Sequence, residues 1–480
     1  MRFELKHTIE KVLVSGKFRV IHAGHMRLFR SATELGNTLI VALDTTNLTK
    51  DEINWRRNIL KNIEYVDQVI EFVGDIEPTL RQVRPEVVIK GQEFRNVDNP
   101  ESKILAEFGG RLVFTSGSNF YSESDLIGRS DSEFIEKLAY LPKSFMSRNT
   151  ITTDRLMEIL ENFANLRVCV VGDLIIDEYI NCHPLGMSQE EPTVVVTPVD
   201  KRRFFGGAGI VAAHCTFLGA KTSFISVTGD DETAEWAMNK AEEYGVASSR
   251  ILDGARPTTL KQRFRSGTQT LLKISHLSQD FLDQQRETEL VERFRELAPT
   301  LNVLIFSDFS YGVLSPIVVD QLQEIAKRNG IFVSADSQSS SQIGNLGKFK
   351  NIDLICATER EARLELKDGS SGLVVIAEGL RSHLGTRNLL LKMGADGVLI
   401  SAEDSSGNIV ATDEISALNK SAVDTSGAGD SMLAGASLAL ATGATIQEAA
   451  LLGSILAGIQ VGRLGNVPIA QDTVSAFLQL

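Results

Sequence analysis

A glycine-rich run near the end of the chain leads into an acidic residue. Residues 423–430 read Val-Asp-Thr-Ser-Gly-Ala-Gly-Asp and precede a stretch of small apolar residues at 431–440. Glycine lets backbone N–H groups approach an anion and a helix start adds positive potential, so the run can form an anion hole for a phosphoryl group. Asp430 can then act as a general base toward an attacking hydroxyl. A plain helix start capped by Asp is the alternative. The anion hole would consist of Gly427, Ala428 and Gly429.

Two histidines flank a glycine close to the start of the chain. Residues 16–25 read Gly-Lys-Phe-Arg-Val-Ile-His-Ala-Gly-His, so His22 and His25 lie at a predicted strand-to-helix turn. Ring N–H groups beside the free backbone amides of a helix start suit a polyphosphate. Such donors stabilise the charge that builds up when a nucleophile attacks the α-phosphorus of a nucleoside triphosphate. Two exposed histidines at a helix start are the alternative interpretation.

The first part of the chain resembles the cytidylyltransferase-type nucleotidyltransferases over residues 10–130. The resemblance rests on the His-x-Gly-His turn, on Arg56, on the strand end at Lys90 and on Ser-Glu-Ser-Asp-Leu-Ile at 122–127. It implies that His22 and His25 donate to the phosphates in the transition state. The nucleotide-binding residues that it implies are Lys17, Gly24, Arg56, Lys90, Ser122 and Ser124.

Two positions depart from this family's pattern. Arg19 follows Phe18 where the family usually has Asp, and the late signature reads Ser-Glu-Ser where Ser-Thr-Thr or Ser-Ser-Thr is more common. Arg19 inverts a charge beside the phosphates. It therefore indicates either an additional anion contact or a domain that binds nucleotide without turnover.

The second part of the chain resembles the ribokinase-like (PfkB) sugar kinases over residues 165–475. The segments that carry the resemblance are Gly-Asp at 172–173 with Asp177, and the glycine-rich runs at 206–209, 394–397, 423–430 and 462–465. The resemblance implies that Asp430 is the base. It also implies Mg²⁺ carried with ATP, through Glu361, and a monovalent-cation site, such as K⁺, near Asp424. The implied sugar-binding residues are Asp177, Gly206 and Gly207, and the implied ATP-binding residues are Lys392, Gly394 and Gly397.

Finer features look closest to the heptose-7-phosphate kinase half of the bifunctional enzymes that make ADP-heptose. These features are Ser-Gln-Glu-Glu-Pro at 188–192, Phe-Ser-Asp-Phe at 306–309 and Arg-Leu-Gly at 463–465. Those enzymes also carry a cytidylyltransferase-like domain, but here the order of the two domains is reversed.

Several substrate-side positions depart from the heptose kinase pattern. The departures are Ile210 for Asn, Tyr311 for Lys, Ser337-Gln338 for Pro-Lys and Thr358 for Asn. Sites discriminate strongly through polar groups that lose their partner, so these changes leave the identity of the sugar more open than the reaction type.

The pattern of the first 130 residues predicts a parallel sheet of the Rossmann-like α/β class. Short β-rich runs alternate with helical patterns, and this alternation is typical of strands joined by right-handed crossovers. We expect strands at 11–18, 38–43, 66–72, 86–90 and 111–115, and helices at 24–35 and 55–63. Ligands bind such sheets at the carboxyl ends of the strands.

A second alternating series predicts a larger ribokinase-like α/β domain. Helical patterns at 134–140 and 153–163 precede it, and its strands are expected at 167–171, 303–306, 331–335, 353–356 and 388–392. Extended segments at 193–199 and 260–265 indicate a small accessory β lid. We therefore expect a nucleotidyltransferase domain at 1–130, a linker at 131–150 and a kinase domain at 151–480.

Composition narrows the class of protein further. The 480 residues hold 49 Lys and Arg against 62 Asp and Glu, which gives a formal net charge of −13. This charge argues against an extensive surface for nucleic acid or anionic membrane. Four cysteines without Cys-x-x-Cys spacing fit a reducing cytoplasm. No export signal or membrane span is expected, because the most apolar stretch is interrupted by glycine and polar residues. We also expect a homo-oligomer.

These observations lead to one main hypothesis and two alternatives. In the main hypothesis the second domain phosphorylates a sugar or sugar phosphate with ATP and Mg²⁺, and the first joins a sugar 1-phosphate to a nucleotide from ATP or CTP, releasing pyrophosphate. In the first alternative one of the two domains is a catalytically silent nucleotide-binding module. In the second, an alcohol-phosphate cytidylyltransferase is attached to an unrelated kinase.

Overall fold

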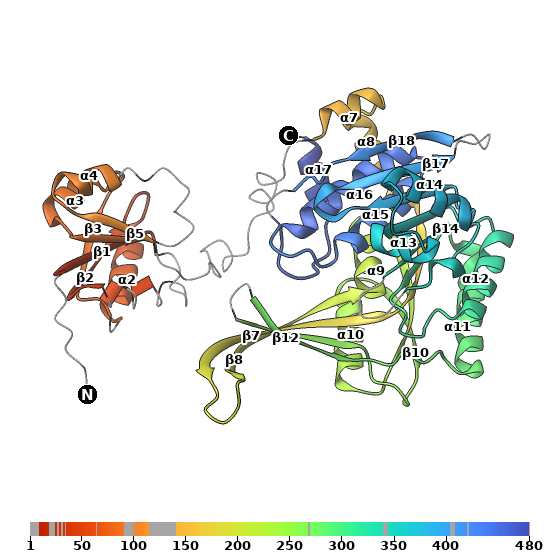
Figure 1. Ribbon diagram of the computed structural model, residues 1–480, viewed down its shortest axis with the longest axis horizontal. Helices are drawn as coiled ribbons and strands as arrows, with labels where there is room; N and C mark the ends of the chain where they lie inside the picture. Colours follow the sequence, from red (N-terminus) through yellow and green to blue (C-terminus); the bar gives the residue numbers. More distant parts are fainter. Residues whose placement is uncertain are drawn as a thin grey trace. The chain divides into compact units, whose positions relative to one another are not determined.

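The chain forms two compact units in a computed structural model (Figure 1). The N-terminal unit comprises residues 1–129, and the C-terminal unit comprises most of the chain from residue 130 onward. The structure describes residues 9–18, 25, 28–29, 32–33, 35–63, 65–90, 99, 101–114, 141–266, 269–338, 344–403, 409–419 and 422–479.

The N-terminal unit contains a five-stranded parallel sheet with the strand order β3-β2-β1-β4-β5. The strands are β1 (Lys11–Gly16), β2 (Thr38–Asp44), β3 (Gln68–Phe72), β4 (Val87–Lys90) and β5 (Arg111–Phe114). The expected Rossmann-like arrangement is therefore confirmed. The strand order reverses direction at β1, where a sheet of this kind opens a crevice for ligands between β1 and β4.

Alternation along β1 divides the apolar side chains of this unit between two cores. Val12 and Val14 pack on one face with Phe29 and Leu60, whereas Leu13 packs on the other face with Leu80. Successive side chains of a strand point to opposite faces, so a sheet covered on both sides needs apolar residues at every position. The helices are α2 (Lys50–Lys61), α3 (Glu77–Val83) and α4 (Glu101–Glu107).

The expected start of the second helix was wrong. The apolar pattern places it at residue 55, but α2 begins at Lys50 because Thr49 and Glu52 form a capping box. The Thr49 hydroxyl accepts from the Glu52 backbone N–H, and the Glu52 carboxylate accepts from the Thr49 backbone N–H. This pairing satisfies amides of the first turn and starts the helix before its apolar face begins.

The C-terminal unit is built on a nine-stranded sheet with the order β10-β9-β6-β13-β14-β15-β16-β17-β18. Its strands are β6 (Arg167–Gly172), β9 (Lys221–Thr228), β10 (Ala247–Leu252), β13 (Val303–Asp308), β14 (Phe332–Ser337), β15 (Leu354–Thr358), β16 (Asn388–Lys392), β17 (Val398–Glu403) and β18 (Ile409–Ile415). The strands from β10 to β16 pair in parallel, and β17 and β18 add an antiparallel edge.

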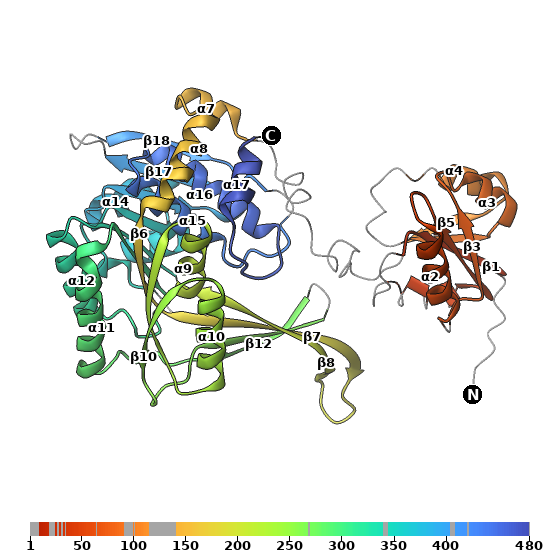
Figure 2. The same ribbon diagram turned by 180° about the vertical axis from the view of Figure 1, so that it is seen from behind.

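Helices cover both faces of this sheet (Figures 1 and 2). One apolar core joins the sheet to α8 (Thr153–Asn162), α9 (Ala208–Phe217), α10 (Glu232–Glu243), α15 (Ala428–Ala441), α16 (Ile446–Val461) and α17 (Gln471–Leu478). The core on the other face includes α11 (Gln284–Leu297), α12 (Pro316–Arg328), α13 (Glu359–Leu366) and α14 (Leu373–Leu384). This is the ribokinase-like doubly wound layering that the sequence predicts.

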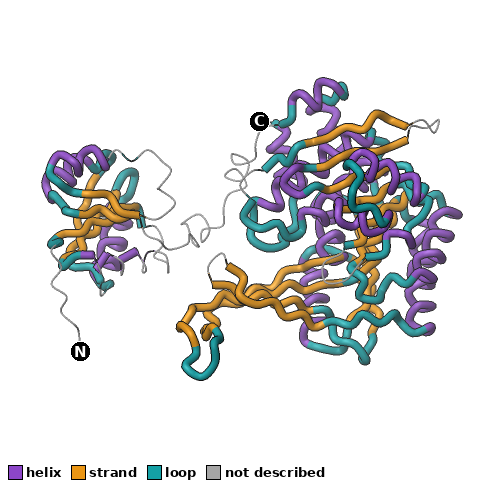
Figure 3. The backbone as a smooth tube through the Cα atoms, viewed as in Figure 1, coloured by secondary structure: helices purple, strands orange, loops and turns teal. Residues whose placement is uncertain are grey.

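A separate four-stranded sheet extends from the C-terminal unit (Figure 3). Its order is β12-β11-β7-β8, and its strands are β7 (Leu174–Met187), β8 (Val194–Gly207), β11 (Leu260–Ser266) and β12 (Gln269–His276). The expected accessory sheet is therefore present, and the long strand β7 is an addition to the expectation. We call this sheet the lid.

The residues before the predicted kinase domain also pack on the C-terminal unit. The short helix α7 (Lys143–Arg148) buries Phe145 and Met146 in the same core as α8. Arg148 forms a two-pronged ion pair with Asp413 of β18, with N–O distances near 3.0 Å from Nε. Part of the predicted linker is thus folded onto this unit, while the helix expected at 134–140 lies outside the described residues.

Among the described residues, none of the helices is long and apolar enough to cross a membrane.

Candidate active sites

The predicted anion hole lies at the start of α15. Gly427 precedes the helix with a φ of 77°, a left-handed conformation that favours glycine. A Cβ atom at this position would lie 2.2 Å from Asn466 Oδ1. The turn therefore needs glycine both for its conformation and for space, and it leaves the first amides of α15, from Ala428 and Gly429 onward, available to an anion.

Asp430 lies in the first turn of α15 and is almost completely buried, with 5% of its surface exposed. Gln338 donates a hydrogen bond from Nε2 to Asp430 Oδ1 at 3.0 Å. Burial raises the pKa of Asp430 to about 7, and the negative charge of Asp336 adds to the effect, while Lys392 opposes it. A carboxylate with a pKa near neutrality is well suited to accept a proton in a reaction.

An ion pair between β14 and β16, the strands on either side of β15, lies close to this carboxylate. Lys392, the last residue of β16, contacts Asp336 of β14 through its ammonium group. Burial raises the pKa of Asp336 to about 6, although Lys392 lowers it. Gly394 and Gly397 follow in the turn between β16 and β17, with φ values of 63° and 103°.

Glu361 lies close enough to this group for its charge to raise the pKa of Lys392. Its carboxylate accepts a hydrogen bond from the Thr358 backbone N–H at 2.7 Å and caps helix α13. The carboxylate is an oxygen ligand of the kind that Mg²⁺ prefers, so the residue fits the predicted role. Within the described part of the chain no cluster of three or more His, Cys, Asp or Glu side chains is arranged to hold a metal.

The predicted sugar-binding residues meet at the base of the lid. Asp177 of β7 forms an ion pair of 3.2 Å with Arg263 of β11 and lies 3.5 Å from Asn466 Nδ2. A Cβ atom at Gly206 would lie 2.5 Å from Asp177 Oδ2, so glycine is needed for this close approach. Gly207 precedes helix α9 with a φ of 56°.

Asp424 lies in a hydrogen-bond network that joins the lid to the loop before the anion hole. Its carboxylate accepts from the Tyr179 hydroxyl at 2.7 Å, from the Ser426 backbone N–H at 3.0 Å and from the Gly465 backbone N–H at 3.1 Å. Burial works against ionisation, but these hydrogen bonds lower the pKa of Asp424 overall. Asp424 therefore supplies an ionised carboxylate at the position where a monovalent cation was expected.

Three partners in this site were not assigned from the sequence. Gln338 contacts Asp430, and Asn466 contacts Asp177. Asp336 forms an ion pair with Lys392. The position of Asn466, directly after the glycine-rich run at 462–465, is a signal that could have identified it. The contact of Gln338 depends on side-chain geometry between residues 92 positions apart, which a sequence pattern does not contain.

The described part of the N-terminal site lies at the carboxyl end of β1. Arg56 is 7% exposed and donates from Nη1 to the Lys17 carbonyl oxygen at 3.0 Å, so these two predicted residues are in contact. Lys90, at the end of β4, forms an ion pair of 2.6 Å with Glu101 and a hydrogen bond of 3.0 Å with Asn99.

The aromatic surroundings of His25 fix the orientation of its ring. Phe18 meets it edge-on at 5.2 Å, and Phe29 stacks against it at 6.3 Å between ring centroids. Phe18, in the segment after β1, has a φ of 44°, a left-handed conformation that is uncommon for a residue other than glycine. The other residues predicted at this site, His22, Gly24, Ser122 and Ser124, lie outside the described residues, as does Arg19.

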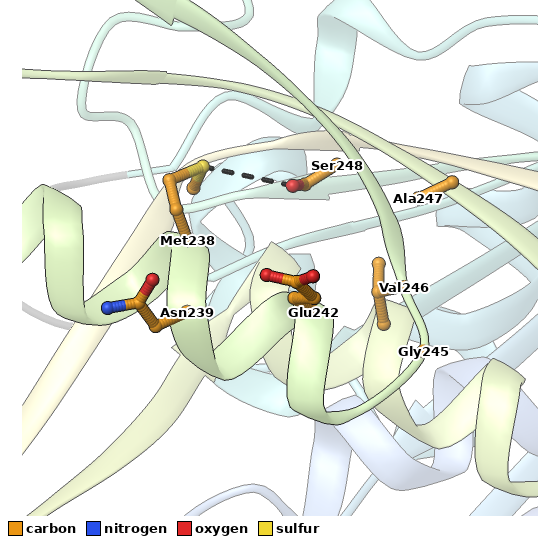
Figure 4. A pocket seen from close by; sticks show the side chains of 7 residues that line it. All are labelled: Met238, Asn239, Glu242, Gly245, Val246, Ala247 and Ser248. Atoms are coloured by element: carbon orange, nitrogen blue, oxygen red, sulfur yellow. Dashed lines mark hydrogen bonds between the residues drawn. The ribbon is translucent and has the colours of Figure 1, made fainter.

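A surface pocket of about 470 Å³ lies elsewhere in the C-terminal unit (Figure 4). It is lined by the last turns of α10 and the start of β10, including Met238, Glu242 and Ser248. Ser248 Oγ contacts Met238 Sδ at 3.8 Å. None of the predicted site residues lines it.

A buried carboxylate behind a glycine turn, at the carboxyl edge of a doubly wound sheet and next to a β lid, defines the C-terminal unit as a phosphotransferase. Comparison with known proteins gives the particular family. The chain belongs to the pfkB family of carbohydrate kinases, whose family model matches residues 165–472. Residues 13–110 match the cytidylyltransferase-like family model, so both resemblances are confirmed.

Two curated relatives match about two thirds of this chain. "Bifunctional protein HldE" of Desulfatibacillum aliphaticivorans is 30% identical over 322 residues, and its namesake from Trichlorobacter lovleyi is 30% identical over 335 residues. These matches cover 66% and 68% of this chain, and 64% and 66% of the relatives, so the match spans just under two thirds of their length. Among solved structures, phosphofructokinase-2 from Escherichia coli in complex with potassium is similar in fold, with a TM-score of 0.53 and 17% sequence identity. The match covers 66% of this chain and 100% of the phosphofructokinase-2 chain.

Proposed function

We propose that the C-terminal unit transfers the γ-phosphate of ATP to a hydroxyl of a sugar phosphate, with Asp430 as the general base. The hydroxyl oxygen forms a bond to the γ-phosphorus, the bond to the β-phosphate oxygen breaks and ADP leaves. Asp430 accepts the hydroxyl proton, and the amides at the start of α15 stabilise the charge on the transferring group. The observation that carries this proposal is the burial of Asp430 directly behind the glycine turn.

Mg²⁺ carried by ATP neutralises charge on its phosphates, and Glu361 is the residue that would contact it. Asp424 is the corresponding residue for a monovalent cation such as K⁺. The residues of this chain do the remaining work: they orient the hydroxyl, hold the proton and keep water away from the transferring group.

The substrate side of the site favours an anionic sugar. Lys261 of the lid lies over the rings of Phe309 and Tyr311, 5.3 and 5.0 Å from their centroids, and Arg263 lies beside it in the same strand. Two cations suit a phosphate, and aromatic rings suit the apolar face of a sugar. Together with the resemblance to the heptose kinases, this supports a heptose 7-phosphate or a similar sugar phosphate as the acceptor.

We propose that the N-terminal unit transfers a nucleotidyl group from ATP or CTP to a sugar 1-phosphate. A phosphate oxygen of the sugar attacks the α-phosphorus, and pyrophosphate leaves with the electron pair of the broken bond. His22 and His25 would stabilise the charge, and Lys17, Arg56 and Lys90 would contact the phosphates.

A second candidate follows from Arg19, which stands where the family usually has Asp. In this case the N-terminal unit binds a nucleotide without turning it over, and the chain is a sugar kinase alone. Nucleotide binding measured by calorimetry, without release of pyrophosphate, would favour this candidate.

The test is mass spectrometry of the products after the full chain is incubated with ATP, CTP, Mg²⁺ and a panel of heptoses, hexoses and their phosphates. We expect a sugar bisphosphate and a nucleotide sugar. Asp430→Asn should remove only the first product in a direct kinase assay, and His25→Ala should remove only the second when a sugar 1-phosphate is supplied. Formation of neither ADP nor pyrophosphate with any of these acceptors would refute the proposal.

We further propose that the chain acts in the cytoplasm as a homo-oligomer formed through the lid. Apolar side chains of the lid are exposed to solvent, including Leu185, Met187 and Val199 at 61–71%. A second copy would cover this surface, since exposed apolar patches of this kind mark interfaces. Val199→Asp should lower the mass measured by light scattering, whereas Val375→Asp, at an exposed position of α14, should not. A mass equal to one chain for the unmodified protein would contradict the oligomer.

A further inference from the structure

The peptide segment that carries Gln338 is held rigidly at the end of the sheet. The Gln338 backbone N–H donates to the Asp308 carbonyl oxygen at 2.8 Å and continues the pairing of β14 with β13 by one residue. Ser337 donates from its hydroxyl to Asp308 Oδ2 at 2.7 Å, and Lys348 pairs with the same oxygen at 2.8 Å. Both Ser337 and Asp308 are buried. The backbone that leads into Gln338 is therefore held against β13.

From this position the Gln338 amide contacts the proposed base. Its Nε2 lies 3.0 Å from Asp430 Oδ1, and among the side chains that the structure describes it is the one hydrogen-bond donor to this carboxylate. The contact occupies Oδ1 and leaves Oδ2 to face a hydroxyl. An ionised carboxylate accepts only, so the amide must present its N–H group to it.

We propose that Gln338 is a positioning residue that keeps the Asp430 carboxyl group oriented before and after it takes the proton. An amide offers a donor on one side and an acceptor on the other. It donates to the carboxylate before proton transfer, and after rotation by half a turn it accepts from the carboxylic acid. A lysine at this place has donors only and could not accept a hydrogen bond from the O–H group of the protonated Asp430. This inference rests on the proposed role of Asp430 as the base.

The charge of residue 338 affects the pKa of Asp430, because the charged groups around this carboxylate have opposing effects on it. Asp430 lies on helix α15, and four strands bring charged groups close to it. These groups are Asp336 from β14, Lys392 from β16, Asp177 from β7 and Lys261 from β11. Two are negative and two are positive. A neutral amide leaves this balance unchanged, so burial dominates and the pKa of Asp430 stays near 7. A lysine at this position would add a third positive charge.

The proposal is tested by the pH dependence of the kinase reaction in variants of the full chain. The assay follows ADP formation with ATP, Mg²⁺ and heptose 7-phosphate. Gln338→Lys should move the acidic limb of the kcat profile to lower pH by about one unit, because a cation favours the ionised carboxylate. Gln338→Glu, of nearly the same shape, should move the limb to higher pH, because two carboxylates share a proton.

A third variant separates orientation from charge. Gln338→Leu removes the hydrogen bond and should lower kcat by roughly 10- to 100-fold while the KM for ATP changes by less than about twofold. Gln321→Leu, at an exposed position of α12, is the matched control and should resemble the unmodified protein. A purely structural role would lower activity in all three Gln338 variants without moving the limb in opposite directions.

The outcomes distinguish this inference from the proposed function. If Asp430→Asn retains kinase activity, Asp430 is not the base and both are refuted. If Asp430→Asn is inactive but the Gln338 variants match the Gln321 control, the positioning role alone is refuted. A second readout, infrared difference spectroscopy, does not need turnover. The carboxyl band of Asp430 is assigned by its loss in Asp430→Asn. The titration of this band should shift to lower pH in Gln338→Lys and to higher pH in Gln338→Glu.

Discussion

Arg263 of the lid donates a hydrogen bond of 2.7 Å to the hydroxyl of Ser426, in the loop that leads into the anion hole. The same guanidinium group donates to the Tyr179 hydroxyl at 2.9 Å and pairs with Asp177 at 3.2 Å. One side chain thus connects the lid, the proposed sugar-binding carboxylate and the proposed phosphate-binding loop. Because its planar fork reaches three partners, a shorter or differently shaped side chain cannot replace it.

Arg263→Gln should therefore weaken the binding of the acceptor sugar more than that of ATP. The substitution leaves the buried carboxylate of Asp177 without its positive partner and loosens the contact between lid and loop. We expect the KM for the sugar phosphate to rise about tenfold or more. Steady-state kinetics with each substrate varied in turn measure this. Lys273→Gln, at an exposed position of the same sheet, is the charge-matched control. An equal loss in both variants would mean that net charge matters and the contacts do not.

Asp430→Asn should make the folded chain more stable at pH 8 than the unmodified protein. The folded-state pKa of about 7 lies above the value near 4 of an unfolded chain, so between these values the folded state binds more protons. Stability is therefore lost as the pH rises from about 4 to about 7, and asparagine, which does not ionise, avoids this loss. Thermal unfolding at pH 4.5 and pH 8 should show a difference in Tm of a few degrees that appears only at the higher pH.

Asp413→Asn provides the control of opposite sign for this measurement. The hydrogen bonds and charge of Arg148 outweigh the effect of burial and lower the pKa of Asp413. The stability that this carboxylate contributes is present above its unfolded pKa and is lost as the pH falls, so the variant should be less stable at pH 8. Equal shifts of Tm in both variants would contradict the electrostatic explanation.

The sequence predicted the central strands of the nine-stranded sheet, from β6 to β16, but not the strands at its two edges, β9, β10, β17 and β18. Runs such as 167–171 and 388–392 are apolar throughout because both faces of their sheet are covered. The missed strands β9 and β10 mix polar residues with apolar ones, so neither has a continuous apolar run. Their formation depends on pairing with neighbours that are distant in the sequence.

The candidate kinase site could be predicted only in part, for a related reason. Asp430 was selected from the glycine-rich run before it, and Asp177 and Lys392 from the resemblance to the sugar kinases. The structure brings these three residues into one buried site. The hydrogen bond from Gln338 and the ion pair with Asp336 depend on how side chains from separate strands meet. Such contacts require the folded arrangement and have no local sequence signal.

Arg56→Gln should impair the nucleotidyl transfer reaction and leave the kinase unaffected. Arg56 is buried against the Lys17 carbonyl at the carboxyl end of β1, where a triphosphate would bind. Its loss should raise the KM for the nucleoside triphosphate about tenfold or more, as expected for hydrogen bonds to a charged ligand. Pyrophosphate release gives the measurement. Arg57→Gln is a matched control on the next residue, because Arg57 forms a half-exposed pair with Glu71 that should contribute little. An effect of the same size in both variants would remove Arg56 from the site.

Gly427→Ala should disable the kinase without unfolding the chain, and Gly443 offers a control that isolates the cause. Both glycines have a left-handed backbone, with φ values of 77° and 87°, so alanine costs about 1–2 kcal/mol at either position. A Cβ at Gly427 would meet Asn466 Oδ1 at 2.2 Å, whereas a Cβ at Gly443 meets no atom within 4 Å. The two variants should thus share this backbone cost, but only Gly427→Ala also displaces the loop that holds the phosphoryl group, and its kcat should fall about 100-fold. If Gly443→Ala lowered kcat as much, general destabilisation and not the anion hole would explain the loss.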